Sequence, residues 1–304
     1  MLIPHINVNL TRLSLGIQQL TQPVNSTGID VDPPLVNGHR QATMPRMRSH
    51  AMTIAHTKRL ALLIALLNGC FSWSLMAAET TVAVASNFTA PMQAIIAEFE
   101  RLSGHRLRVS FGSSGKFFAQ IHNGAPFDAF LSADATKPRA LEDQQLAVAG
   151  SRFTYAIGTL ALWSATDGSD AKQRLQAGNF TRLAIANPRL APYGAAAMQT
   201  LTAMTLGDQV RSKLVLGENI SQTYQFVATG NAQLGFVALS QILDKGVIPA
   251  GAWVIPADMH QPIRQEAVLL QRGRDNPATQ ALLQFLRTKE AGDIMINYGY
   301  RISE

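Results

Sequence analysis

Two pairs of hydrogen-bond donors stand out in the most regularly patterned part of the sequence. Ser86 and Asn87 follow one apolar run, and Ser113 and Ser114 follow the next. Where such residues begin a helix, the free backbone N–H groups and the helix dipole add further donors and a partial positive charge. A set of this kind binds a carboxylate or an oxyanion without Lys or Arg. Each residue taken alone is more typical of a simple N-cap, and the repetition of the design at two successive turns shifts the balance modestly towards an anion site.

The elements around these donors are predicted to be strands and helices of a parallel sheet. Residues 81–85 form a short β-branched run typical of a buried strand, and apolar residues three and four apart between Met92 and Leu102 predict the helix that follows. Residues 107–111 and 116–122 repeat the plan as strand and helix. Because the turns at the carboxyl ends of parallel strands meet in one crevice, both donor pairs are expected to face the same space.

Two more units of the same design follow in the second half of the chain. A strand over 182–186 leads into a turn with two prolines and a helix to Met204, and a strand over 214–216 leads into a polar turn and a helix that ends at Gly230. Residues 153–163 are long for one strand and are expected to pass from one lobe to another. Residues 265–270 are expected to pair antiparallel. The alternation of strands and helices predicts an α/β fold.

Catalytic interpretations are weaker than the binding interpretation. His105, His122 and His260 are far apart and match no zinc spacing, so no metal-cation site is predicted. The Gly112–Gly115 turn is not Gly-x-Ser-x-Gly, and it lacks the lysine of a nucleotide phosphate loop. Asp128 and Asp134 are interpreted as capping or solvated residues. We therefore predict that the protein is not an enzyme. A hydrolase is the alternative, and it would need a histidine within hydrogen-bond reach of one of the two serines.

The first 78 residues are predicted to lie outside the folded domain. Residues 1–46 are polar and proline-rich and are interpreted as disordered or as sequence upstream of the true start. Residues 47–78 combine a basic segment with a short apolar run, typical of a signal peptide cleaved near Ala77 or Ala78. Cys70, the only cysteine, lies in a stretch similar to a lipoprotein cleavage box except at Asn68. Ordinary cleavage and a periplasmic protein are expected, with lipidation at Cys70 as the alternative.

Charge gives no indication of a nucleic-acid partner. The chain has a net charge of +6, part of which lies in the predicted leader, and the remainder contains no basic run or stripe.

Seven short motifs in order now point to a known family. Together they resemble the periplasmic molybdate-binding proteins of bacterial ABC importers, the ModA family, from about Thr81 to the C-terminus. The motifs are Ala85-Ser86-Asn87-Phe88, Gly112-Ser113-Ser114-Gly115, Asn123-Gly124-Ala125-Pro126, Phe130-Leu131-Ser132-Ala133-Asp134, Gly150-Ser151-Arg152-Phe153-Thr154-Tyr155-Ala156, Asn187-Pro188 with Ala191-Pro192-Tyr193-Gly194, and Leu234-Gly235-Phe236-Val237-Ala238.

The resemblance implies a type II periplasmic binding protein fold with two lobes. Each lobe is expected to be a mixed, mostly parallel sheet flanked by helices, with the ligand in the cleft between the lobes. The implied boundaries are residues 79–155 plus 260–304 for the first lobe and 156–259 for the second.

The resemblance also implies which residues hold the anion. Members of the family often carry a tyrosine that corresponds to Ala238, so that side-chain donor is absent here. Ser-Asn at the first turn and Tyr at the third are expected to replace it. Tyr193 and Ile220 are expected to act through backbone N–H. The full implied set is Ser86, Asn87, Ser114, Tyr193 and Ile220.

The chemistry of this set suits molybdate or tungstate, which carry no proton at neutral pH and need only donors. Phosphate is best held with a carboxylate acceptor, and none is in the set, although Glu218 is near the fourth turn. A sulfate, thiosulfate or other oxyanion receptor of the same fold is the main alternative, and an organic-solute receptor with an Arg or aromatic clamp is another. The resemblance further implies a monomer without cofactor that delivers its ligand to an inner-membrane permease with its ATPase.

Overall fold

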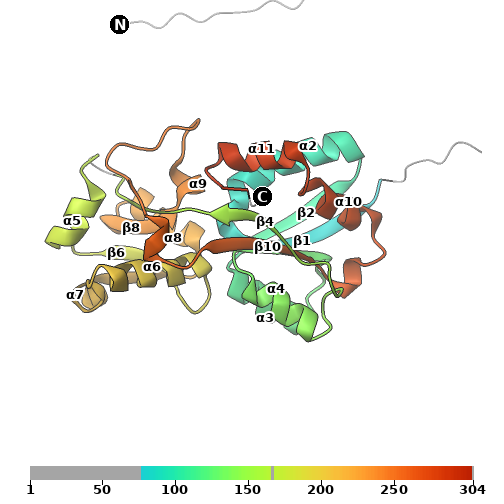
Figure 1. The fold of residues 1–304 in the computed structure, drawn as a ribbon, viewed down its shortest axis with the longest axis horizontal. Coiled ribbons are helices and arrows are strands. Elements are labelled where there is room, and N and C mark those ends of the chain that lie inside the picture. Colours follow the sequence, from blue (N-terminus) through green and yellow to red (C-terminus); the bar gives the residue numbers. More distant parts are fainter. Residues whose placement is uncertain (1–76, 166–167, 303–304) are drawn as a thin grey trace, which may run out of the picture. The chain divides into compact units, whose positions relative to one another are not determined.

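The structure is a computed structural model and describes residues 77–165 and 168–302. The segments predicted as disordered and as signal peptide therefore lie outside the described residues, except for Ala77 and Ala78. Two five-stranded sheets with their helices make up the described part (Figure 1). No helix in this part is long and apolar enough to cross a membrane.

The first sheet has the strand order β2-β1-β3-β10-β4. β1 pairs in parallel with β2 and β3, whereas β10 is antiparallel to both β3 and β4. In Figure 1, α2, α10 and α11 lie on one face of this sheet and α3 and α4 on the other. The strands are β1 (Glu79–Ala85), β2 (Arg106–Gly112), β3 (Ala129–Ser132), β4 (Phe153–Gly158) and β10 (Ile263–Leu269), and the helices are α2 (Thr89–Ser103), α3 (Ser114–His122), α4 (Thr136–Asp143), α10 (Pro277–Phe285) and α11 (Lys289–Asn297).

Local sequence explains why β1 and α2 form where they do. β1 lies between two strands and beneath helices, so the continuous apolar run Val82-Ala83-Val84 is fully buried. α2 ends at Gly104, whose φ of 69° is a left-handed conformation that glycine adopts readily, and its N–H donates to Glu100 O. The strand and helix predicted from this stretch are confirmed.

The second sheet repeats the plan, with the strand order β7-β6-β8-β5-β9. β6 pairs in parallel with β7 and β8, and β5 is antiparallel to β8 and β9. Its strands are β5 (Leu160–Trp163), β6 (Leu183–Ala186), β7 (Leu214–Gly217), β8 (Leu234–Ala238) and β9 (Trp253–Val254), and its helices are α5 (Ala171–Ala177), α6 (Pro192–Ala203), α7 (Gly207–Val210), α8 (Ile220–Ala228) and α9 (Leu239–Ile242).

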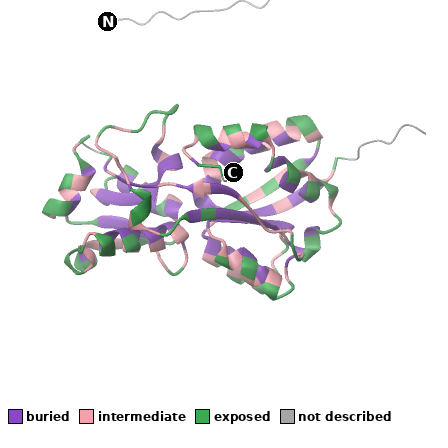
Figure 2. Ribbon diagram, viewed as in Figure 1, coloured by how far each residue is buried: buried purple, intermediate pink, exposed green. Residues whose placement is uncertain are grey.

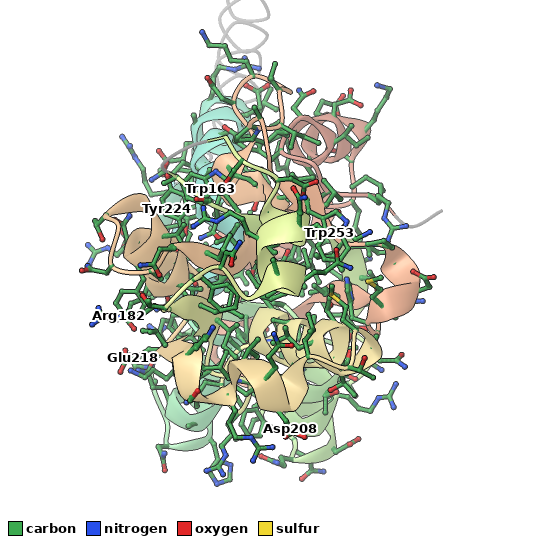
Figure 3. All side chains as sticks on the ribbon, turned by 90° about the vertical axis from the view of Figure 1, so that its left-hand side faces the viewer. Trp163, Arg182, Asp208, Glu218, Tyr224 and Trp253 are labelled. Carbon is green, nitrogen blue, oxygen red and sulfur yellow. The ribbon has the colours of Figure 1, made fainter. Side chains whose placement is uncertain are left out.

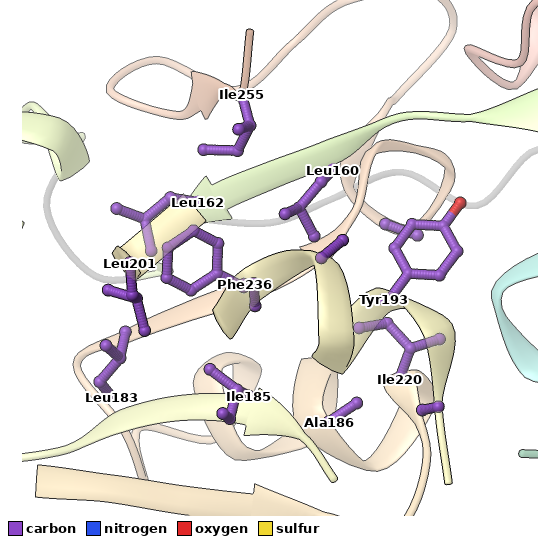
Figure 4. Close-up of a cluster of buried hydrophobic side chains, with 14 of the residues drawn as sticks. Leu160, Leu162, Leu183, Ile185, Ala186, Tyr193, Leu201, Ile220, Phe236 and Ile255 are labelled. Carbon is purple, nitrogen blue, oxygen red and sulfur yellow. The ribbon is translucent and has the colours of Figure 1, made fainter. Parts of the chain in front are cut away.

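Each sheet carries its own apolar core. Strands of both sheets are largely buried, while the outer faces of the helices are exposed (Figure 2). Figure 4 shows the core of the second sheet, to which β5 contributes Leu160, β8 Phe236 and α6 Tyr193. These cores hold the strand ends in place, and the polar turns follow directly from those ends.

The chain passes between the two sheets twice. β4 ends at Gly158 in the first sheet and β5 begins at Leu160 in the second. The return runs from β9 through the short 3-10 helix η3 (Ala257–Met259) to β10. The long stretch 153–163 is therefore two strands in two sheets, as predicted, and β10 is antiparallel, as predicted. The two lobe boundaries stay predictions.

Four polar turns leave the carboxyl ends of parallel strands. β1 leads into the 3-10 helix η1 (Ser86–Phe88) and then α2, β2 leads into α3, β6 into α6, and β7 into α8. In the first sheet β1 lies between β2 and β3, and in the second β6 lies between β7 and β8. The strand order therefore reverses at β1 and at β6. Ligand crevices form outside the strand ends at such reversals.

Candidate anion-binding site

The four turns meet at one small cavity. About 10 Å³ of it is open to the centre of a water molecule, roughly the space that one water needs. All five residues of the implied anion set contribute to its wall, so the structure brings them together from both sheets. The cavity is lined by Ala85, Ser86, Asn87, Gly112, Ser113, Ser114, Ala133, Ala191, Pro192, Tyr193 and Ile220.

At the first turn, the side-chain NH2 group of Asn87 donates both of its hydrogens within the protein. Its Nδ2 donates to Gln265 Oε1 and to the Tyr300 hydroxyl, both at 2.9 Å. Both amide hydrogens are therefore used, and Asn87 has its backbone N–H left to offer an anion. The Ser86 hydroxyl makes no hydrogen bond with any residue in the described ranges and is one of the side chains that line the cavity.

At the second turn the two serines have different roles. Ser113 is the N-cap of α3, and its Oγ accepts from Lys116 N at 3.3 Å. Ser114 Oγ accepts from Ala133 N at 2.9 Å, and Ser114 is only 1% exposed. Since a hydroxyl has one hydrogen to donate, the Ser114 hydroxyl can accept from Ala133 and still donate into the cavity.

At the third turn, a proline reduces the unpaired backbone N–H groups at the start of α6 to one. Pro192 is the first residue of the helix and has no N–H, so Tyr193 supplies the first N–H of α6. The next two N–H groups, of Gly194 and Ala195, both donate to Ala191 O. The first N–H groups of a helix have no partner within the helix, which leaves the Tyr193 N–H for a ligand.

At the fourth turn, Asn219 caps α8 and orients its first donors. The Asn219 side chain accepts from Gln222 N at 2.9 Å, and Asn219 O accepts from Thr223 N at 3.1 Å. Ile220 and Ser221 are the first two residues of the helix, so their N–H groups have no partner within it. The Ser221 hydroxyl donates to Ser86 O at 3.1 Å and joins the fourth turn to the first.

The Tyr193 side chain does not face an anion. Its ring is in the apolar core of the second sheet (Figure 4), and its hydroxyl is buried without a hydrogen bond to any described residue. Burial, together with the neighbouring Tyr300, raises the pKa of the Tyr193 phenol well above its usual value. The hydroxyl lies against Gly158, because a Cβ at that glycine would come within 2.1 Å of it. The group of Tyr193 that remains available to an anion is its backbone N–H, and its role as a ligand stays a prediction.

The electrostatic character of the cavity comes from helix starts rather than charged side chains. None of the eleven lining residues carries a charge. The nearest charged side chains on the turns pair with each other, with Lys116 Nζ 2.7 Å from Glu218 Oε2. This pair is 44% and 58% exposed, and Glu218 lies at the edge of the molecule in Figure 3. Glu218 is consequently not an acceptor inside the cavity, and no carboxylate lines it.

Several contacts across the cavity join the two sheets. Gly115 N donates to Leu190 O at 2.8 Å, and Ser240 Oγ donates to Asn87 O at 2.8 Å. The approach at Gly115 is close, since a Cβ there would lie 2.9 Å from Leu190 O. Gly115 thus brings α3 against the turn before α6, the Lys116–Glu218 pair joins α3 to the turn before α8, and Ser240 joins α9 to the first turn.

The described histidines do not serve either serine as a base. His105 Nδ1 accepts from Ala78 N, His122 Nδ1 bonds Gln144 Oε1, and His260 Nδ1 bonds Gln261 O. This argues against the serine hydrolase alternative. The capping interpretation is confirmed for Asp134, which accepts from Lys137 N at the start of α4. It is wrong for Asp128, which is buried, accepts from Thr81 N in β1 and pairs with Arg272.

Sequence reasoning missed the residues that hold the site from a distance. Gln265, Tyr300 and Ser240 contact Asn87 from β10, from the end of the chain and from α9. No local motif marks them. A larger depression of about 820 Å³ lies elsewhere, lined by residues that include Ala94, Lys245 and Tyr298, and none of the four turns contributes to it.

Comparison with known proteins gives consistent results. The family model described as bacterial extracellular solute-binding protein matches residues 80–301. The molybdate-binding protein ModA of Azotobacter vinelandii is 51% identical over 242 residues, covering 79% of this chain and 96% of the relative. ModA of Rhodobacter capsulatus is 46% identical over 225 residues, covering 74% and 88%. The solved Azotobacter vinelandii periplasmic molybdate-binding protein has a TM-score of 0.71 at 37% identity, covering 74% of this chain and all of that one.

Proposed function

Because the chain belongs to the bacterial extracellular solute-binding proteins, and its relatives at 51% and 46% identity are molybdate-binding proteins, we propose that it captures molybdate for an ABC importer. One observation carries the proposal. The five residues inferred as oxyanion ligands all line one cavity that contains no charged side chain. The expected ligands are Ser86, Asn87, Ser114, Tyr193 and Ile220.

The available hydrogen-bond donors are suited to binding a fully deprotonated oxyanion. Ser114 offers a hydroxyl hydrogen, and Asn87, Tyr193 and Ile220 offer backbone N–H groups at or near helix starts. Hydrogen bonds to a charged group contribute about 1.5 to 3 kcal/mol each, so a few of them suffice for tight binding. A protonated phosphate is best held with a carboxylate acceptor, and none of the residues that line the cavity is Asp or Glu. Tungstate has the same charge and shape as molybdate and is proposed as a second ligand.

Closure of two lobes on the anion is proposed as the binding mechanism. The cavity has space for about one water, whereas a tetrahedral oxyanion has five heavy atoms. The turns must therefore separate to admit the ligand and settle around it. The crossings at Gly158–Leu160 and between β9 and β10 are the expected hinges, because they link the two sheets.

The proposed setting is the periplasm, with release of the ligand to a membrane permease and its ATPase. Relatives of this chain are periplasmic binding proteins, and the described helix starts offer binding groups rather than a catalytic arrangement. The protein is accordingly proposed to be a non-enzymatic, monomeric carrier without a cofactor.

The experiment that tests this function is calorimetric titration of the purified protein with molybdate, tungstate, sulfate and phosphate under identical conditions. Tight one-to-one binding of molybdate and tungstate, with no heat from sulfate or phosphate, is the expected result. Binding of sulfate at similar strength would move the protein to a broader class of oxyanion receptors. No binding of any of the four would refute the proposal.

A further inference from the structure

A buried polar network holds the first turn of the site from behind. Asn87 donates to Gln265 and Tyr300 through its side chain, and its carbonyl oxygen accepts from the Tyr300 hydroxyl and Ser240 Oγ, both at 2.8 Å. The four residues are almost fully buried, with exposed fractions of 2% for Asn87, 0% for Gln265, 4% for Tyr300 and 6% for Ser240. Both hydrogens of the Asn87 side-chain amide have an acceptor, and its backbone carbonyl has two donors.

Hydrogen bonds to two successive carbonyls hold both peptide units of the first turn. A peptide unit is planar, so an anchored carbonyl sets the direction of the N–H on the same unit. Ser86 O is held by Thr89 Oγ1 at 2.8 Å and Ser221 Oγ at 3.1 Å, which orients the Asn87 N–H. Asn87 O is held by Tyr300 and Ser240, which orients the Phe88 N–H. The first turn is thus preorganised on both of its peptide units.

Tyr300 is the member of the network with the most contacts to the first turn. Its hydroxyl both accepts from Asn87 Nδ2 and donates to Asn87 O, and its ring packs edge-on against Phe88 with centroids 5.3 Å apart. Tyr300 itself is held against β4, because Arg301 and Ile157 exchange two backbone hydrogen bonds of 2.7 and 3.0 Å. The end of the chain therefore connects a crossing strand to the anion site.

We propose that Tyr300 is a positioning residue for oxyanion binding, which holds the first turn in its binding geometry through Asn87 without touching the ligand. This inference rests on the proposed function. A preorganised turn binds its ligand with less loss of conformational freedom, so loosening the turn weakens binding even though no ligand contact is removed. Sequence patterns give no hint of the role, since Tyr300 lies 213 residues from Asn87.

The test compares molybdate titrations of the unsubstituted protein, Tyr300→Phe and Tyr155→Phe. Tyr155 is a matched control, because its ring also packs edge-on against Phe88, with centroids 5.0 Å apart, but its buried hydroxyl has no partner among the described residues. We expect Tyr300→Phe to bind molybdate about ten-fold more weakly, the equivalent of one or two lost hydrogen bonds. Tyr155→Phe is expected to bind within about two-fold of the unsubstituted protein, because it removes no hydrogen bond.

A double-mutant cycle with Ser240→Ala separates positioning from general destabilisation, because Ser240 Oγ and the Tyr300 hydroxyl both donate to Asn87 O. If Tyr300 acts by holding this carbonyl, the effects of Tyr300→Phe and Ser240→Ala on molybdate affinity are not additive. A purely structural role would give the same fold-change in both backgrounds. If Tyr300→Phe does not fold, Ser240→Ala removes the other donor to the same carbonyl, and we expect it to weaken binding in the same direction.

The outcomes distinguish this inference from the proposed function. Unchanged molybdate affinity in Tyr300→Phe, or additive effects in the cycle, would overturn the positioning role while leaving the molybdate function intact. An unsubstituted protein that fails to bind molybdate would overturn both, and the failure would be visible before any variant is measured.

Discussion

At the scale of single residues, the site combines a few side-chain hydroxyls with backbone donors. Ser114 is the clearest side-chain donor, since its oxygen accepts from Ala133 N and its hydrogen is left for the cavity. Accepting from one N–H also polarises the hydroxyl, which strengthens it as a donor. Asn87 shows the opposite arrangement, because both hydrogens of its side-chain amide are donated within the protein.

Replacing the hydroxyl of Ser114 is expected to weaken molybdate binding. The loss of one hydrogen bond to a charged ligand amounts to about 1.5 to 3 kcal/mol, or roughly ten-fold to more than a hundred-fold in affinity, measured for Ser114→Ala by calorimetric titration. Ser103→Ala is a matched control, because Ser103 Oγ also accepts a backbone N–H, from His105, but lies at the far end of α2. Equal affinities of the two variants would remove Ser114 from the site.

At the scale of elements, the close approach of α3 to the turn before α6 depends on a glycine. Gly115 N donates to Leu190 O at 2.8 Å, and a Cβ at Gly115 would lie 2.9 Å from that oxygen and 3.0 Å from Leu190 Cα. The neighbouring atoms are backbone and cannot turn aside. Any side chain at Gly115 therefore has to move α3 and the turn apart.

Gly115→Ala is expected to change stability and affinity in opposite directions. Alanine favours a helix over glycine by up to about 1 kcal/mol, so the melting temperature of the ligand-free protein should stay the same or rise. Molybdate affinity should fall, because the added methyl group destabilises the conformation in which α3 contacts the turn before α6. Overpacking of this kind costs about 1 to 3 kcal/mol. Gly207→Ala serves as the control, since nothing lies within 4 Å of a Cβ there. A normal affinity for Gly115→Ala would show that this contact is absent from the liganded state.

At the scale of the whole molecule, three of the five tyrosines are buried near the site and the strands that cross between the sheets. Burial, opposed by hydrogen bonds from Ser240 and Asn87, raises the pKa of Tyr300 to about 12. Burial also raises the pKa of Tyr155 and of Tyr193 well above the ordinary value of 10.0. The folded protein thus keeps protons that the unfolded chain releases near pH 10.

Alkaline pH is therefore expected to destabilise the fold. Above a pH of about 10 the unfolded chain binds fewer protons than the folded one, so the free energy of unfolding falls as pH rises. Tyr300 alone accounts for a loss of about 2 to 3 kcal/mol by pH 12, and the other two tyrosines add to it. Denaturant titrations at several pH values measure this loss. In Tyr155→Phe the slope above pH 10 should be shallower, and an unchanged slope would contradict the assignment.

The sequence by itself determined the elements and the order of the polar turns. An apolar run such as Val82-Ala83-Val84 specifies a buried strand, Gly104 specifies the end of a helix, and Pro192 specifies the start of another. These are local effects of side-chain periodicity and backbone conformation, which act over a few residues and can be read from spacing alone. The position of the turns at strand ends then indicated where an anion could bind.

Only the tertiary structure decided how each donor is used. The amide of Asn87 is occupied by Gln265 and Tyr300, which lie 178 and 213 residues further along the chain, and Glu218 is paired with Lys116 instead of reaching the cavity. The Tyr193 hydroxyl is buried against Gly158. Such contacts depend on how whole sheets and helices pack, and the energy that orients a side chain comes from neighbours that no local spacing identifies.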